Sequence, residues 1–163
     1  RRRPARSGNL RPPSPIAASL RNMALSKDER EQFLAEPHIA ALSVDAGAGR
    51  GPLTVPIWYQ YAPGGEPWVL TGAGSRKAKL IEAAGSFSLM VERTEPTLRY
   101  VAVDGTVSRI EPGTDDLHAE LAHRYLPPDR AEKFLEYALA QLGEQVVIYL
   151  RPQHWISADL GAI

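Results

Sequence analysis

Alternation of apolar and polar residues predicts a series of β-strands along this chain. Short runs rich in branched and aromatic side chains are separated by clusters of Gly, Pro and Asp. A period of two is typical of a strand that buries one face. The pattern predicts six strands, over residues 38–45, 53–61, 68–71, 86–92, 97–110 and 145–150. The last continues irregularly to residue 156, and the fifth is interrupted near Asp104 and Gly105.

Two segments in the first half of the chain carry helix start signals. Ser26 precedes Glu29 by three residues, the spacing of a capping box. The segment 75–84 begins at Ser75, a favourable N-cap, and is followed by Gly85, which suits the left-handed position after a helix. We therefore expect one helix before the first strand and another between the third and fourth strands.

Two further helices are predicted between the fifth and sixth strands. Thr114 begins the first, whose apolar residues recur at a spacing of four (Leu117, Leu121 and Tyr125). Pro127 and Pro128 end it, and Asp129 with Glu132 would cap the second. That helix carries an apolar stripe (Phe134, Leu135, Ala138, Leu139 and Leu142) and ends at Gly143.

This order of elements predicts a mainly β, α+β fold, a six-stranded antiparallel barrel with peripheral helices. Strict alternation of strand and helix is absent, which disfavours a doubly wound α/β sheet. Pro56 lies inside the second strand and cannot donate a ladder hydrogen bond, so we expect an edge or a bulge there.

Length and composition indicate one domain after a short lead-in. Residues 1–22 contain six Arg, four Pro and no acid, whereas residues 23–163 contain 13 basic and 19 acidic residues, a net charge of −6. We interpret 1–22 as a basic, Pro-rich N-terminal extension without a binding role and 23–163 as the functional domain. An arm for nucleic acid or an acidic membrane is the alternative, favoured less because the domain shows no second basic surface nearby in sequence.

Several chemistries are excluded or disfavoured by what the sequence lacks. The absence of Cys excludes disulfides, thiolate zinc sites, iron–sulfur clusters and thiol catalysis. No apolar run is long enough to span a membrane, and no secretory signal is present, so a cytoplasmic protein is expected. The four His residues form no metal-ligand pattern, with His118 and His123 expected on different, solvated helix faces. We predict no metal site and no obligatory catalytic acid or base.

The segment 71–79 contains the strongest chemical signal in the sequence. Arg76, Lys77 and Lys79 gather where a strand passes into a helix, in an otherwise acidic domain. A helix N-terminus presents free N–H groups and a positive dipole end, which favour anions. Gly72 and Gly74 allow close approach of backbone to an anion. These residues point to a phosphate or carboxylate site, and an exposed basic first turn is the alternative.

The motif Thr71-x-x-Gly74-Ser75-Arg76-Lys77-Ala78-x-x-Ile81 closely resembles the phosphate-binding segment of the pyridoxamine 5′-phosphate oxidase-like split-barrel flavoproteins. The similarity extends over residues 38–110, including the Tyr100–Val107 segment, but not over residues 1–22. The resemblance implies a split barrel, a homodimer with two cofactor sites at the subunit interface, and phosphate binding by Thr71 and residues 74–77.

Two departures from the pyridoxamine phosphate oxidases change the expected cofactor. The strand 53–61 lacks the Arg and Lys of those enzymes, and the segment 151–155 lacks their Arg-Leu-His element. The Pro-x-Trp-Tyr strand and short C-terminus resemble the branch that uses the deazaflavin coenzyme F-420. The resemblance implies that Pro56, Trp58 and Tyr59 wall the flat ring system. Trp155 would cover the substrate, the partner subunit or only the barrel end.

The resemblance implies an F-420-dependent oxidoreductase that transfers hydride to an unsaturated small molecule. The cofactor-binding residues would be Pro56, Trp58, Thr71, Gly74, Ser75, Arg76 and Lys77. An oxidoreductase that uses flavin mononucleotide (FMN) and a non-catalytic flavin or haem carrier remain the alternatives. Neither nucleic acid nor a membrane is an expected partner, and the substrate is not readable from the sequence.

Overall fold

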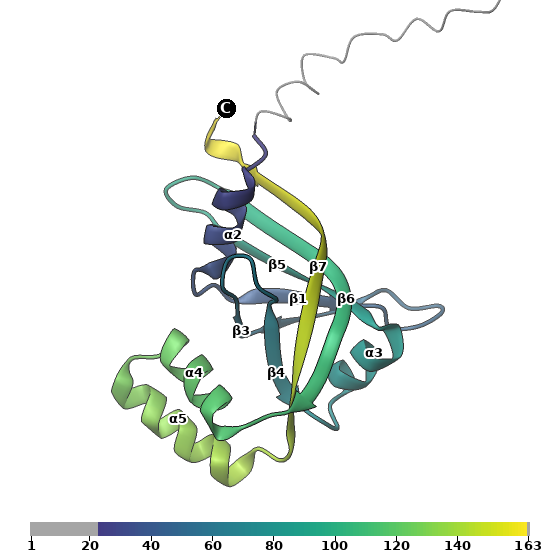
Figure 1. The fold of residues 1–163 in the computed structure, drawn as a ribbon, viewed down its shortest axis with the longest axis vertical. Coiled ribbons are helices and arrows are strands. Elements are labelled where there is room, and N and C mark those ends of the chain that lie inside the picture. The colour runs from purple at the N-terminus through teal and green to yellow at the C-terminus, as the bar shows by residue number, and fades with distance from the viewer. Residues whose placement is uncertain (1–22, 163) are drawn as a thin grey trace, which may run out of the picture.

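The computed structural model describes residues 23–162, which contain four α-helices and one seven-stranded sheet (Figure 1). The strands are β1 (Ala40–Val44), β2 (Leu53–Ile57), β3 (Tyr59–Gln60), β4 (Trp68–Gly72), β5 (Ser86–Arg93), β6 (Arg99–Pro112) and β7 (Gln145–Asp159). The helices are α2 (Lys27–Ala35), α3 (Arg76–Ala84), α4 (Asp115–Tyr125) and α5 (Pro128–Gln141), with a final 3-10 turn η1 (Leu160–Ala162). The basic extension 1–22 lies outside the described residues.

The sheet is antiparallel throughout, in the order β2-β1-β5-β6-β7-β4-β3. Its two outer strands, β2 and β3, are consecutive in the chain and are separated only by Trp58. The predicted strand 53–61 is therefore divided, because its first half pairs with β1 and its second half with β4. The predicted antiparallel α+β fold is confirmed, but the expected six-stranded split barrel is corrected to a sheet of seven strands that is not closed and whose two edge strands are joined by the chain.

Long strands β6 and β7 form the spine of the sheet and run side by side in Figure 1. The predicted interruption near Gly105 is a register shift between Asp104 and Gly105, and the strand continues through it. A second shift lies between Val107 and Arg109. The last strand, expected to become irregular after residue 150, pairs with β6 as far as Asp159. Bulges of this kind let a long pair bend without losing its ladder.

Most of the apolar core lies on one face of the sheet. Strand residues such as Leu42, Leu89 and Val103 pack there with Phe33 of α2 and Ile81 of α3. A smaller cluster lies on the other face of β4 and β7, under the α4–α5 hairpin (Trp68, Leu121 and Val147, with Trp58, Leu70, Leu117, Tyr125 and Tyr149 against them). The period of two along β4 and β7 therefore sends alternate side chains into two separate cores.

Local capping decides where most of the helices begin. Ser26 and Glu29 form the predicted capping box, and Ser75 caps α3, which ends at Gly85 in the left-handed conformation with φ 67°. The prediction for α5 was wrong: Pro127 is its N-cap without a side-chain cap, and Asp129 lies in the first turn. Pro128 starts that helix because its fixed φ suits the first helical position.

None of the helices in residues 23–162 is long and apolar enough to cross a membrane. In Figure 1, α3 and the α4–α5 hairpin lie on opposite sides of the lower end of β4.

Candidate functional site

The connection from β4 to α3 brings two hydroxyl groups to a helix N-terminus. Thr71, at the end of β4, is buried, and its Oγ1 lies 3.4 Å from Oγ of Ser75. The Ser75 hydroxyl accepts from the amide of Ala78 at 3.1 Å, as an N-cap should. The amide of Ser75 donates to the Gly72 carbonyl at 3.0 Å, which closes the turn between the strand and the helix. The turn is therefore fixed by the chain's own hydrogen bonds.

The first turn of α3 carries positive charge without a local counter-charge. It contains no acidic residue, and within the described residues no hydrogen bond or ion pair engages the side chain of Arg76 or Lys77. The backbone amides of these two residues also have no hydrogen-bond partner within residues 23–162. A Cβ added at Gly74 would meet no atom within 4 Å, so the space beside the turn is open. Free donors, two cations and open space suit an anionic group.

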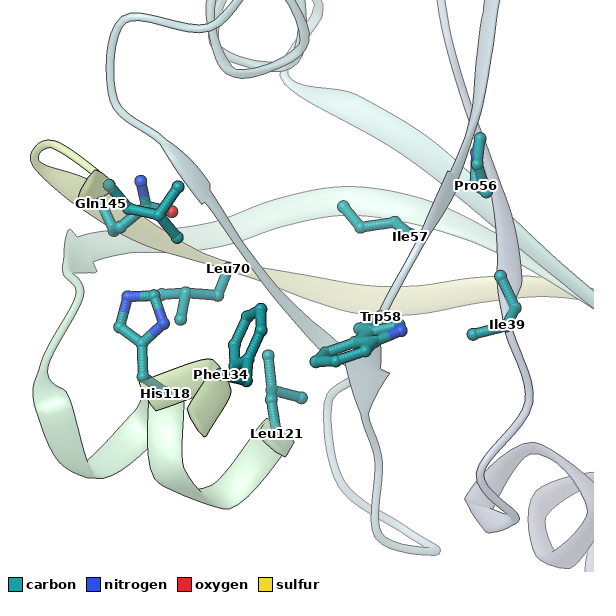
Figure 2. A pocket seen from close by; sticks show the side chains of 10 residues that line it. Ile39, Pro56, Ile57, Trp58, Leu70, His118, Leu121, Phe134 and Gln145 are labelled. Carbon is teal, nitrogen blue, oxygen red and sulfur yellow. The ribbon is translucent and has the colours of Figure 1, made fainter. Parts of the chain in front are cut away.

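The predicted ring-contacting residues lie at a different place, beneath the α4–α5 hairpin. Pro56 and Trp58 line a cavity of about 350 Å³, with walls from β2, β4, α4, α5 and β7. Figure 2 shows the Trp58 indole beside Phe134 at one end of this cavity and the His118 ring near Leu70. The indole stacks on the Tyr125 ring, with centroids 4.9 Å apart and an angle of 16° between the planes.

Within one chain, five of the seven predicted cofactor-binding residues lie together, and the other two, Pro56 and Trp58, lie apart from them. Thr71, Gly74, Ser75, Arg76 and Lys77 lie together in the connection from β4 to α3, the candidate anion-binding turn. Leu70 points into the cavity that contains Pro56 and Trp58, and Thr71 is the next residue along β4, so its side chain points to the opposite face. The turn and the cavity thus lie on opposite faces of the same strand.

Two aromatic residues expected near the cofactor have structural contacts instead. Tyr59 is fully buried, and its hydroxyl donates to the Leu34 and Glu36 carbonyls at 2.6 and 3.1 Å. The expectation that Tyr59 walls the ring system is therefore wrong. Trp155 packs against Tyr61 and lies under the Arg30 guanidinium, 4.6 Å from its ring centroid, and so covers the end of the core.

The histidine predicted to be solvated on α4 instead lines the cavity. His118 is half-buried, and desolvation lowers the pKa of its imidazole against a smaller opposing effect of Asp115. A sequence signal did exist, since His118 precedes the buried Leu121 by three residues and therefore shares its helix face. His123 is exposed, as expected. Sequence reasoning also missed Phe134 and Gln145 as cavity residues.

The remaining titratable groups form structural contacts rather than a catalytic arrangement. The Arg99 guanidinium contacts the Asp159 carboxylate at 2.8 Å. Burial raises the pKa of the Tyr61 phenol to about 12, so that group remains protonated at neutral pH. Among the described residues no group of three His, Cys, Asp or Glu side chains could hold a metal ion.

Comparison with solved structures identifies the fold. A conserved hypothetical protein, Rv2991, from Mycobacterium tuberculosis is 23% identical, with a TM-score of 0.65, over 84% of this chain and 86% of that chain. An F-420 reductase is 22% identical, with a TM-score of 0.61, over 77% and 94%. A candidate pyridoxamine 5′-phosphate oxidase from Listeria innocua is 11% identical, with a TM-score of 0.52, over 80% and 96%.

The chain has the fold of the pyridoxamine 5′-phosphate oxidase-like proteins. Other matches with this fold include a FAD-binding protein from Mesorhizobium loti and the haem storage protein HutZ from Vibrio cholerae. No protein-family profile and no curated sequence matches the chain. The matched proteins thus share the pyridoxamine phosphate oxidase-like fold but differ in the ligands that their names record.

Proposed function

We propose that this protein is an oxidoreductase that binds the deazaflavin coenzyme F-420 and transfers hydride to an unsaturated small molecule. The observation that carries the proposal is the open, positively charged N-terminus of α3 beside Thr71 in a pyridoxamine phosphate oxidase-like fold. An F-420 reductase is among the proteins of the same fold, which supports this cofactor. The lack of Arg and Lys between residues 53 and 61 supports it over FMN.

The residues of the turn have complementary tasks in holding a phosphate. The Arg76 guanidinium can donate two parallel hydrogen bonds to phosphate oxygens, and Lys77 supplies a compact positive charge. The free backbone amides of Arg76 and Lys77 lie at the positive end of the helix dipole, where they can donate hydrogen bonds to an anion. Ser75 keeps α3 capped, and the contact between its hydroxyl and Thr71 fixes the position of both side chains. The turn is therefore preorganised, and the chain would lose little conformational freedom when it binds a phosphate.

The positions of Trp58 and the anion-binding turn support a homodimer as part of the proposal. The two lie on opposite faces of β4, so an extended cofactor held by the turn of one copy would meet Pro56 and Trp58 of another. Large apolar side chains are exposed on the described surface, among them Ile39 at 55% and Ile156 at 61%. An interface that covered such side chains would remove their apolar surface from water, which would favour the dimer.

The bound coenzyme would supply the hydride chemistry, and the protein would orient it and exclude water. The aromatic and aliphatic walls around Trp58 provide a surface of low polarity. Protonation of the product by water is part of the proposal.

FMN dependence and a non-catalytic carrier are the competing functions, and the fold matches favour neither over the other. A colourless purified protein that binds F-420 and oxidises its reduced form with an unsaturated acceptor would support the proposal. A yellow protein with flavin absorbance would favour FMN. Tight binding without turnover over a panel of acceptors would favour a carrier.

Replacing both Arg76 and Lys77 by Ala tests the site itself. Charge-assisted hydrogen bonds contribute roughly 1.5–3 kcal/mol each, so the double variant should bind the coenzyme at least tenfold more weakly. A fluorescence titration of F-420 measures the affinity. The matched control replaces Arg130 and Lys133, two exposed residues of α5, and should bind as the original does. Equal affinities in the two double variants would refute the site.

A further inference from the structure

Two adjoining cavities lie between the α4–α5 hairpin and the sheet. The first has a volume of about 350 Å³ and the second about 460 Å³. They share three wall residues: His118, Leu142 and Gln145. Volumes of this size are typical of sites for small molecules, which occupy roughly 300–1,000 Å³. The proposed function uses Pro56 and Trp58 of the first cavity but gives no role to the rest of this space.

The hairpin is held away from the sheet by contacts at the end of α4. The Tyr125 hydroxyl bonds to the backbone of His38 and Tyr59, and Trp58 stacks on the Tyr125 ring. The Arg124 guanidinium donates to the Ala35 and Glu36 carbonyls at 2.9 and 2.8 Å. These contacts fix the position of the hairpin relative to β4. The walls of the space beside His118 are therefore held in place.

Two polar side chains are available in cavities whose shared walls are otherwise apolar. The His118 imidazole makes no hydrogen bond with the described residues. The Gln145 Nε2 donates a long hydrogen bond of 3.4 Å to the Gly143 carbonyl, and its Oε1 accepts none from the residues that the structure describes. Figure 2 shows both side chains on the same side of the cavity as Leu70. A few polar groups among apolar walls are the usual makeup of a ligand site.

The charges around the cavities decide which ligands fit. Neither cavity is lined by Lys or Arg, and Asp115, Asp116 and Glu144 lie around the second one. The lowered pKa of His118 leaves its ring neutral at pH 7, able both to donate and to accept. An anion would meet carboxylates and no cation there, whereas a neutral molecule would keep its hydrogen bonds and bury its apolar surface.

We propose that these joined cavities bind a neutral aromatic or alicyclic molecule that carries one hydroxyl or carbonyl group, held by His118 and Gln145. The cavities form a recess between α4, α5 and the sheet, which suits a small molecule, and the exposed Tyr137 of α5 is not among their wall residues. Binding at this site requires no cofactor, although Pro56 and Trp58 of the first cavity also belong to the proposed coenzyme site.

The test uses three matched probes on the full chain without cofactor: 2-naphthol, naphthalene and 2-naphthoate. Saturation-transfer NMR and calorimetry at pH 7 should show 2-naphthol binding at least tenfold more tightly than 2-naphthoate, and more tightly than naphthalene. Equal binding of the neutral and anionic probes would overturn the proposal. Loss of 2-naphthol binding as the protein concentration rises would also overturn it, since a second copy would then occupy the face.

A histidine pair on one helix supplies the control. His118→Phe should lower 2-naphthol affinity about fivefold or more, as expected for one hydrogen bond, and change naphthalene affinity less than twofold. His118→Gln, which keeps a donor, should restore most of the preference, and His123→Phe, on the exposed side of α4, should change nothing. Unchanged 2-naphthol affinity in a folded His118→Phe protein, checked by thermal unfolding, would overturn the proposal.

Discussion

At the scale of single residues, Tyr125 connects the hairpin to the strands. Its hydroxyl accepts from the Tyr59 amide at 3.1 Å and lies 2.8 Å from the His38 carbonyl, to which it donates. Tyr125→Phe leaves a half-buried amide without a partner, so the free energy of unfolding should fall by about 1–3 kcal/mol. Urea unfolding measures this change. Tyr137→Phe, at a 56% exposed position, is the control and should have almost no effect.

Asp159 makes stability depend on pH. Hydrogen bonds from Arg99, the Gly161 amide and Thr97 hold the pKa of its carboxyl below the usual 3.8. A carboxyl with a lowered pKa in the folded state contributes stability above its unfolded pKa and loses it as the pH falls through the folded value. Asp159→Asn should therefore lower the melting temperature at pH 7, and the difference from the original should shrink below about pH 4.

A charge-matched control separates this contact from a change in net charge. Glu92→Gln removes one exposed carboxylate that forms no ion pair with the described residues. Its melting temperature should follow the original at every pH. A gap between the original and Asp159→Asn that stays constant from pH 7 to pH 3 would contradict the assignment.

At this scale the sequence predicts helix caps, which depend on neighbouring residues, but not the contacts between residues far apart in the chain. Ser26, Ser75 and Gly85 were predicted correctly because capping depends on neighbours in the sequence. The Tyr59 hydroxyl bonds α2, some 25 residues away, and no sequence pattern indicates that contact. The prediction that His118 is solvated was wrong because it rested on the polar character of histidine. The position of His118 on the helix face of Leu121 places it in the cavity.

At the scale of elements, the β6–β7 pair depends on one glycine. A Cβ at Gly105 would clash with the Arg151 carbonyl oxygen and carbon, which belong to the neighbouring backbone. Gly105→Ala should therefore destabilise the protein by at least about 1–3 kcal/mol, the cost of overpacking. Chemical unfolding measures the loss. The same change at Gly143, where a Cβ meets nothing within 4 Å, should be nearly neutral.

The division of residues 53–61 into two strands could not be predicted from the sequence. Residues 53–61 look like one strand because their side chains are branched and aromatic. Their division at Trp58 is set by hydrogen-bond partners in β1 and β4, which are distant in the sequence. Conversely, the register shift at Gly105 was anticipated as an interruption, because glycine inside a strand often marks a bulge.

At the scale of the whole molecule, the account predicts a homodimer. The candidate anion-binding turn and Trp58 lie on opposite faces of β4, so the proposed cofactor site would require two copies. Light scattering after size-exclusion chromatography should give about twice the chain mass of 17.9 kDa. A monomer that still binds the coenzyme with full affinity would contradict the shared site.

The antiparallel fold and the position of the basic turn were predictable from the sequence, because strand alternation and capping are local. The separation of Thr71 from Trp58 was not, since it follows from how β4 sends alternate side chains into two cores. The net charge of residues 23–163 is negative, so the free cations of α3 are a local exception. Their meaning depends on the fold around them.

The central claim is that Arg76 and Lys77 bind a cofactor phosphate. The most direct test measures how much a phosphate contributes to affinity, by titrating F-420 and its deazaflavin chromophore without the phosphate, and FMN and riboflavin alongside. The account predicts that the phosphate strengthens F-420 binding at least tenfold, and that this gain disappears in the double Ala variant. A phosphate contribution that is absent in the original protein, or unchanged in the variant, would contradict the account.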